Sequence, residues 1–130
     1  MSKVVDFLNE AKTYYLATVE ENEARIRPIG ATVAYDGKVY FGTNNQKEMF
    51  KQLIKNPNVA ISGMSNMQWI RITGKAVVDP NIDAKKALLD ANPAVKEMYS
   101  IDDGIFEVFY LKDMKAILYS FAEAPVELEN

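Results

Sequence analysis

Residues 25–58 read RIRPIGATVAYDGKVYFGTNNQKEMFKQLIKNPN, and the order of elements in this stretch decides the fold. Two segments with the composition of β-strands flank Asp36-Gly37, a dipeptide that tolerates the positive φ angles of a type I′ turn, so we expect a β-hairpin. The apolar residues that follow recur at helical spacing until Asn56-Pro57, where the helix should stop. The stretch therefore predicts a strand, a hairpin and the start of a helix in close succession.

The second strand of this hairpin ends where the helix should begin, and Thr43, Asn44, Asn45 and Lys47 occupy that junction. A helix N-terminus presents unpaired backbone N–H groups and the positive end of the macrodipole, so it is suited to bind an anion such as phosphate. A lysine there opposes the dipole unless an anion neutralises it, which favours a binding role over a solvated surface lysine. The alternative for the asparagines is a turn or cap role, and Asn45 with Glu48 has the spacing of a capping box.

The composition limits the chemistry that the chain can perform. With 130 residues, 48% hydrophobic and 25% charged, we expect one domain over residues 1–130. A formal net charge of -3 argues against nucleic acid as a partner. The chain has no Cys and no His, which excludes disulfides and thiolate catalysis and removes the commonest general base and haem ligand.

We expect neither a metal site nor a membrane partner. A metal would have to bind carboxylates alone, because the chain lacks Cys and His. No apolar run approaches the ~20 residues of a membrane span, and the first residues lack the apolar core of a secretory signal. We therefore expect a cytoplasmic protein.

Outside residues 25–58 the sequence alternates between hairpins and short helices. We expect helices at 2–12, with Ser2 as N-cap, at 82–91 and at 94–99, and strands at 13–19, 24–29, 58–64, 68–79, 106–111 and 115–121. The last two strands should form a hairpin with its turn at 112–114. Residues 123–130 form an acidic segment that we expect to be a loosely held, flexible tail.

These elements predict a fold that is mainly β with short helices. About seven strands joined by hairpins are typical of a closed or nearly closed antiparallel barrel with helices over its ends. A two-layer α+β sandwich is the alternative. A doubly wound α/β fold is disfavoured because hairpins cannot join parallel strands.

Four segments of the chain carry a resemblance to a known family: Arg27-Pro28, Tyr40-Phe41-Gly42-Thr43, Lys55-Asn56-Pro57-Asn58-Val59 and Trp69-Ile70-Arg71-Ile72-Thr73-Gly74-Lys75-Ala76. With these residues the chain resembles the pyridoxamine 5′-phosphate oxidase-like FMN-binding split barrels, well over residues 13–79 and more loosely beyond. The resemblance implies an antiparallel split β-barrel that forms a homodimer with FMN at the interface.

The resemblance also implies which residues bind the cofactor. Arg27, Pro28 and Ile29 match the strand along the flavin, Thr43 matches the phosphate-binding threonine, and Trp69 falls where a residue approaches from the partner subunit. Where the oxidases have Arg-Lys in the helix, this chain has Glu48 and Met49, so a nearby lysine must substitute. The predicted cofactor-binding set is Arg27, Pro28, Ile29, Thr43, Asn44, Asn45, Lys47, Lys51 and Trp69.

Two of these residues, Arg27 and Trp69, have an alternative structural interpretation. Arg27 lies two residues from Arg25, so both arginines point to one side of a strand and could form a solvated face. Trp69 could be a core residue, because burial of an indole removes a large apolar area from water.

For the function we expect an FMN-binding flavoprotein, an oxidoreductase that exchanges electrons with small-molecule donors or acceptors. FMN itself performs the redox chemistry, so the lack of Cys and His is no obstacle, and we assign no catalytic side chain. The chain lacks the C-terminal Arg-and-His segment that the true oxidases use for their vitamin substrate, which disfavours pyridoxamine phosphate oxidation. The alternative is a non-catalytic flavin-binding or electron-carrier module. A haem-handling barrel is weaker because no His ligand exists.

Overall fold

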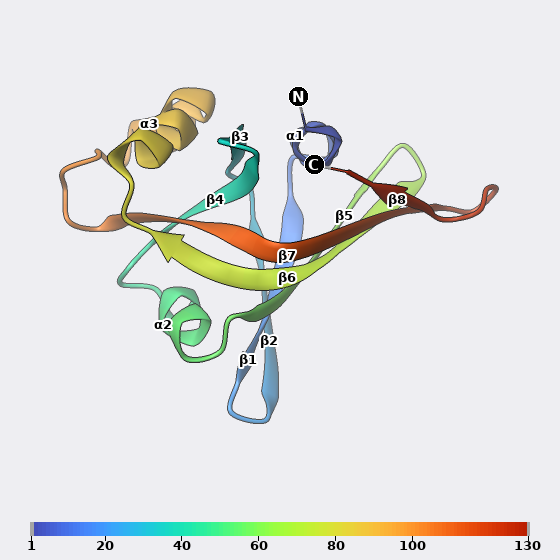
Figure 1. The fold of residues 1–130 in the computed structure, drawn as a ribbon, viewed down its shortest axis with the longest axis horizontal. Helices are drawn as coiled ribbons and strands as arrows, with labels where there is room; N and C mark the ends of the chain where they lie inside the picture. The colour runs from blue at the N-terminus through green and yellow to red at the C-terminus, as the bar shows by residue number, and fades with distance from the viewer. Residues whose placement is uncertain (1, 130) are drawn as a thin grey trace.

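The computed structural model describes residues 2–129, which form one antiparallel sheet with short helices around it (Figure 1). The elements in chain order are α1 (Lys3–Ala11), β1 (Tyr14–Glu20), β2 (Glu23–Ile29), β3 (Thr32–Tyr35), β4 (Lys38–Asn44), α2 (Glu48–Lys55), β5 (Asn58–Ser65), β6 (Gln68–Asp79), α3 (Ile82–Ala91), α4 (Pro93–Lys96), β7 (Phe106–Ser120) and β8 (Val126–Leu128). None of the helices formed by residues 2–129 combines the length and the apolar character that a bilayer crossing requires.

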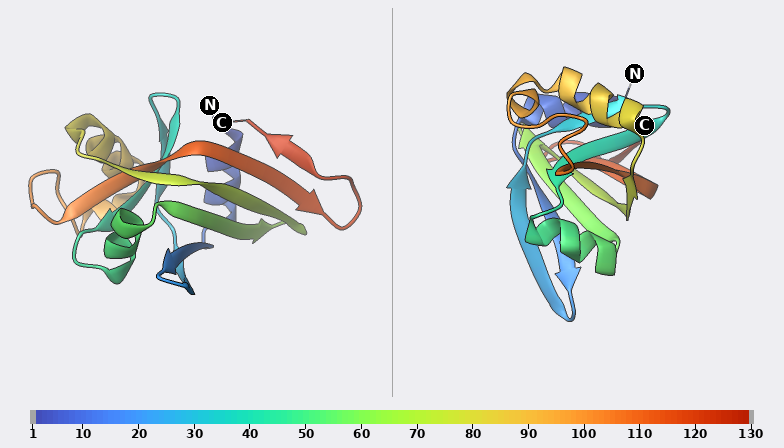
Figure 2. Two further views of the ribbon diagram at one scale, coloured as in Figure 1. Left: turned by 60° about the horizontal axis from the view of Figure 1, so that its bottom comes forward. Right: turned by 90° about the vertical axis from the view of Figure 1, so that its left-hand side faces the viewer.

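The sheet is a barrel that does not close. Its eight strands follow the order β2-β1-β5-β6-β7-β4-β3, with β8 added to β7, and neighbouring strands run antiparallel. The end strands β2 and β3 do not pair with each other in the described part of the chain, so the barrel is split. The predicted fold class, mainly β with an antiparallel split barrel, is confirmed. In Figure 1 and in the right-hand view of Figure 2, α1 and α3 lie at one end of the barrel and α2 lies toward the other.

Local sequence signals explain several of these elements. Asp36 and Gly37 adopt φ angles of 51° and 72°, as the expected type I′ turn between β3 and β4 requires. The Ser2 side chain accepts a hydrogen bond from the backbone N–H of Val5 at 3.1 Å, which makes it the predicted N-cap of α1.

Strand β4 is buried on both of its faces, which places it at the centre of the packing. Phe41 belongs to the larger hydrophobic cluster, which includes the buried residues of α1 and α2, whereas Tyr40 belongs to a second cluster beneath α3. Because side chains alternate along a strand, Gly42 lies on the same face of β4 as Tyr40, and Thr43 lies on the same face as Phe41. A Cβ atom on Gly42 would lie 2.8 Å from Leu88 Cδ2 and 3.2 Å from Phe106 Cε1, so a larger residue would force these side chains of α3 and β7 to shift.

The predicted hairpin at 112–114 is wrong, because β7 runs without a turn from Phe106 to Ser120 and pairs with β6 along its length. The register shifts where Thr73 faces Lys115 and Lys75 faces Lys112, which leaves Asp113 and Met114 opposite a single residue. Asp113 has a φ of 54° there. A β-bulge therefore lies where the sequence predicts a turn.

We expect the acidic segment at 123–130 to be a loosely held tail. Part of this segment is a short strand. Val126–Leu128 forms β8, which pairs antiparallel with residues 116–118 of β7.

Candidate functional site

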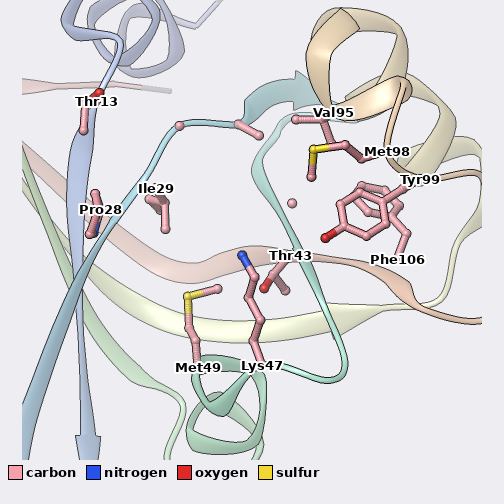
Figure 3. A pocket seen from close by; sticks show the side chains of 13 residues that line it. Thr13, Pro28, Ile29, Thr43, Lys47, Met49, Val95, Met98, Tyr99 and Phe106 are labelled. Atoms are coloured by element: carbon pink, nitrogen blue, oxygen red, sulfur yellow. The ribbon is translucent and has the colours of Figure 1, made fainter.

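A cavity of about 420 Å³ opens where β2, β4, α2 and the segment after α4 meet (Figure 3). This volume is typical of small-molecule pockets. Residues from six parts of the chain line the cavity: Thr13, Pro28, Ile29, Gly30, Ala31, Gly42, Thr43, Lys47, Met49, Val95, Met98, Tyr99 and Phe106. It therefore includes four of the nine predicted cofactor-binding residues, namely Pro28, Ile29, Thr43 and Lys47.

Thr43 brings a buried polar group to this cavity that has no hydrogen-bond partner within residues 2–129. Its side chain is 5% exposed, and its Oγ1 atom forms no hydrogen bond. A buried hydroxyl without a partner costs about 1–3 kcal/mol, so such an atom in a cavity wall indicates a place for a ligand atom. The hydroxyl of Tyr14 is also buried and unpaired, but Tyr14 does not line the cavity.

Lys47 supplies the positive charge of the cavity. Its side chain extends from the start of α2 and lies beside Thr43, with the ammonium group pointing into the cavity (Figure 3). Within residues 2–129 it forms no ion pair, and no Asp or Glu lines the cavity. A lone cation beside an unpaired hydroxyl at a helix N-terminus can bind an anion.

The two asparagines of the junction hold the segment 97–107 against β4 and do not line the cavity. Asn44 accepts a hydrogen bond from the Gln46 N–H at 3.0 Å and donates one to the Tyr99 hydroxyl at 2.6 Å. Asn45 donates to the carbonyl of Gly104 at 2.9 Å and to Glu107 Oε2 at 3.0 Å.

The capping box expected from Asn45 and Glu48 is wrong. Helix α2 begins at Glu48, and its N-cap, Lys47, forms no side-chain cap hydrogen bond. Asn45 precedes the N-cap by two residues, and its side chain is occupied by the segment 97–107. The first N–H groups of α2 therefore lack the side-chain partner that a capping box would supply.

Arg27 points away from the cavity, toward α2. Its guanidinium group donates to Thr18 Oγ1 at 2.7 Å and to Gln52 Oε1 at 2.6 Å, and the Thr18 hydroxyl donates to the same Gln52 oxygen at 2.6 Å. Partial burial, and secondarily the neighbouring charge of Arg25, lower the pKa of Arg27. Arg25 itself is exposed and forms ion pairs with Glu20 and Glu23. Arg25 therefore lies on a solvated face of the strand, whereas the hydrogen bonds of Arg27 connect β2 to β1 and α2.

The structure places Lys51 and Trp69 outside the cavity as well. Lys51 is exposed and lies 3.5 Å from Glu48. Trp69, half-buried on β6, stacks on Tyr119 with 5.7 Å between ring centroids and contacts Phe121 at 4.9 Å. Neither residue reaches the cavity of its own chain.

Sequence reasoning missed the apolar and aromatic wall of the cavity. Val95, Met98 and Tyr99 come from α4 and the residues after it, and Phe106 begins β7. The spacing of Val95, Met98 and Tyr99, at i, i+3 and i+4 of a short helical piece, predicts a shared face. That spacing does not reveal that the face meets β4, more than fifty residues earlier in the chain.

We expect Gln52→Leu to destabilise the fold by about 1–3 kcal/mol, because it leaves the Arg27 guanidinium and the buried Thr18 hydroxyl without their shared acceptor. Urea denaturation at fixed protein concentration measures this change. Lys55→Ala, at an exposed position of the same helix, is the control and should change stability by less than about 0.5 kcal/mol. Equal effects of the two substitutions would contradict the assigned network.

The structure is a split barrel with a cavity whose wall contains the ammonium group of Lys47 and the hydroxyl of Thr43. The chain belongs to the pyridoxamine 5'-phosphate oxidase family, whose model matches residues 1–117. No curated protein matches the chain.

Solved structures share this fold. A NimC/NimA family protein from Clostridium acetobutylicum is 43% identical, with a TM-score of 0.94 over 98% of this chain and 90% of that chain. General Stress Protein 26 from Bacillus anthracis is 18% identical, with a TM-score of 0.74 over 97% and 96%. A heme binding protein from Mycobacterium smegmatis is 20% identical, with a TM-score of 0.67 over 94% of this chain and 57% of that chain. The last two similarities concern the fold alone.

Proposed function

We propose that this protein is an FMN-binding flavoprotein that exchanges electrons with small molecules. The observation that carries the proposal is the unpaired, buried Thr43 hydroxyl in a cavity wall beside the unpaired ammonium group of Lys47. A phosphate oxygen accepts hydrogen bonds from both kinds of group, and charge-assisted bonds of this kind are strong. The membership of the chain in the pyridoxamine 5'-phosphate oxidase family supports a flavin phosphate as that anion.

The remaining wall of the cavity suits the rest of a flavin. Ile29, Met49, Val95 and Met98 are apolar, and Pro28 and Ile29 lie on the strand that resembles the flavin strand of the family. Bound FMN would supply the redox chemistry, while the protein supplies binding, orientation and electrostatics. Thr43 and Lys47 would hold the phosphate, and the apolar residues would exclude water.

Haem is the competing cofactor, because one protein with this fold is described as a heme binding protein. The present chain has no His and no Cys, and these residues supply the proximal ligand in the most familiar haem proteins. The absence of both residue types favours flavin over haem.

We further propose a homodimer. Strand β2 ends the sheet order and is exposed at most positions, with Ile26 71% exposed. Trp69 and Tyr119 form an aromatic stack with Phe121, which is 72% exposed. Exposed apolar groups of this kind are typical of interaction surfaces. A second copy of the chain would bury them, and Trp69 would then approach the partner's flavin.

Sedimentation equilibrium should give twice the chain mass of 14.7 kDa. Phe121→Glu should shift the protein toward monomer, because a buried charge in an apolar contact is costly. Ile82→Glu, at a residue 50% exposed on α3, is the control and should leave the mass unchanged. A monomeric wild-type protein that still binds FMN tightly would contradict the dimer.

The oxidoreductase activity has its own test. We expect NADH or NADPH to reduce the bound FMN in anaerobic stopped-flow experiments, and quinone or nitroaromatic acceptors to reoxidise it. No ionisable side chain other than Lys47 and Tyr99 lines the described cavity, so chemistry that needs only the flavin is favoured. If every donor and acceptor pair fails while FMN stays bound, the protein is a flavin-binding or electron-carrier module instead.

A further inference from the structure

Tyr99 is held in the cavity wall from two sides. Its ring stacks on Phe106 with 5.4 Å between ring centroids and an interplanar angle of 29°. Its backbone N–H donates to the Val95 carbonyl at 3.1 Å, which continues the turn of α4. The hydroxyl points into the cavity on the side of Thr43 (Figure 3). The position of this hydroxyl is therefore fixed before any ligand binds.

The hydrogen bonds of Asn44 determine where the hydroxyl proton of Tyr99 can point. The backbone N–H of Gln46 donates to Asn44 Oδ1 at 3.0 Å, so the amide NH₂ group is the end that faces Tyr99. That NH₂ group donates to the Tyr99 oxygen at 2.6 Å. A phenol has one proton and can accept and donate at the same time. Because Tyr99 accepts from Asn44, its own proton remains available for another acceptor.

No group in residues 2–129 accepts that proton. Lys47 is the only charged residue among those that line the described cavity, and Thr13 and Thr43 each add a hydroxyl group. A phosphate group on a ligand carries about -1.5 to -2 charges and three strong acceptor oxygens. Such a group can accept further hydrogen bonds beside those of Lys47 and Thr43, and the free Tyr99 proton lies in the same cavity.

We propose that Tyr99 donates a hydrogen bond to the phosphate of the bound flavin and that Asn44 acts as its positioning residue. The proposal rests on the proposed function and adds a third donor to the phosphate site. It also assigns a role to Asn44, which acts through Tyr99 and does not contact the ligand.

The test compares FMN with riboflavin, which lacks the phosphate, by quenching of flavin fluorescence in titrations of the apoprotein. Tyr99→Phe keeps the ring and its stacking but removes the proton, so FMN affinity should fall about tenfold or more while riboflavin affinity stays unchanged. Tyr35→Phe, in a ring that packs on Tyr40 away from the cavity, is the control and should alter neither affinity.

Asn44→Asp is the sharper variant for the positioning role. The carboxylate has the size of the amide and still accepts a hydrogen bond from the Gln46 N–H. It has no N–H to donate to Tyr99, so it accepts the Tyr99 hydroxyl proton instead. That proton is then no longer available to the phosphate. It should lower FMN affinity at least as much as Tyr99→Phe and spare riboflavin. A residue that merely supports the fold would lower both affinities together. The new carboxylate also repels a phosphate directly, so Asn44→Asp is repeated in the Tyr99→Phe background, where the positioning role predicts little further loss of FMN affinity and charge repulsion alone predicts the same loss as in wild type.

The outcomes separate this proposal from the proposed function. Unchanged FMN binding by Tyr99→Phe, or equal losses for FMN and riboflavin, overturns the role of Tyr99 and leaves flavin binding intact. A wild-type protein that binds neither FMN nor riboflavin overturns both proposals.

Discussion

Lys47→Ala should lower the affinity for FMN by about 10- to 100-fold and change the affinity for riboflavin far less, since a charge-assisted hydrogen bond contributes about 1.5–3 kcal/mol. Lys47 is the only cation among the described cavity-lining residues, so no neighbour can replace it. Isothermal titration of the apoprotein with each flavin measures both affinities.

Lys51→Ala is the matched control for this prediction. Lys51 lies one turn further along α2, exposed beside Glu48 and outside the cavity. Its removal should leave both affinities near the wild-type values. If Lys51→Ala reduces FMN binding as strongly as Lys47→Ala, or if Lys47→Ala weakens both flavins equally, the phosphate assignment fails.

Thr43→Val tests the same phosphate site by removing the unpaired hydroxyl group. Valine has nearly the same shape but needs no hydrogen bond, so the apoprotein should be as stable as wild type or more stable. FMN binding should weaken nonetheless. This opposite response of stability and affinity would not arise from damage to the fold.

Phe109→Ala should have the largest effect on stability, about 3–5 kcal/mol of the free energy of unfolding. Phe109 is fully buried on β7, and its ring stacks on Phe41 of β4 at 5.5 Å between centroids. The two residues are paired in the register of these strands. The substitution leaves a cavity at the contact that keeps β4 against β7. Because a typical domain is stable by about 5–15 kcal/mol, a large part of the stability should be lost.

Urea denaturation at one protein concentration measures this loss, and Ile54→Ala serves as the control. Ile54 is 60% exposed on α2, so its truncation removes little buried area and should change stability by less than about 1 kcal/mol. A loss below about 1 kcal/mol for Phe109→Ala would contradict the central role of this contact.

Local turn chemistry made most of the fold predictable from the sequence. The Asp36-Gly37 turn, the Ser2 cap and the stop at Asn56-Pro57 each act over a few residues, and all three lie where expected. The hairpin expected at 112–114 is wrong because a bulge uses the same polar residues as a turn. Only pairing with β6, far away in the sequence, distinguishes the two.

The candidate site was predictable where its parts are neighbours in the chain. Thr43 and Lys47 lie at one strand-to-helix junction, and both line the cavity. The side chains of Asn44 and Asn45 instead hold the segment 97–107, which the sequence does not place near β4. The role of Tyr99 depends on this long-range contact, so the junction alone could not reveal it.

The visible absorption spectrum of the freshly purified protein tests flavin binding most directly, together with chromatography of the chromophore released on denaturation. The account predicts a flavin spectrum, released FMN, and near one FMN per chain after reconstitution. A haem spectrum, or a colourless protein that takes up no FMN when the cofactor is added in excess, would contradict it.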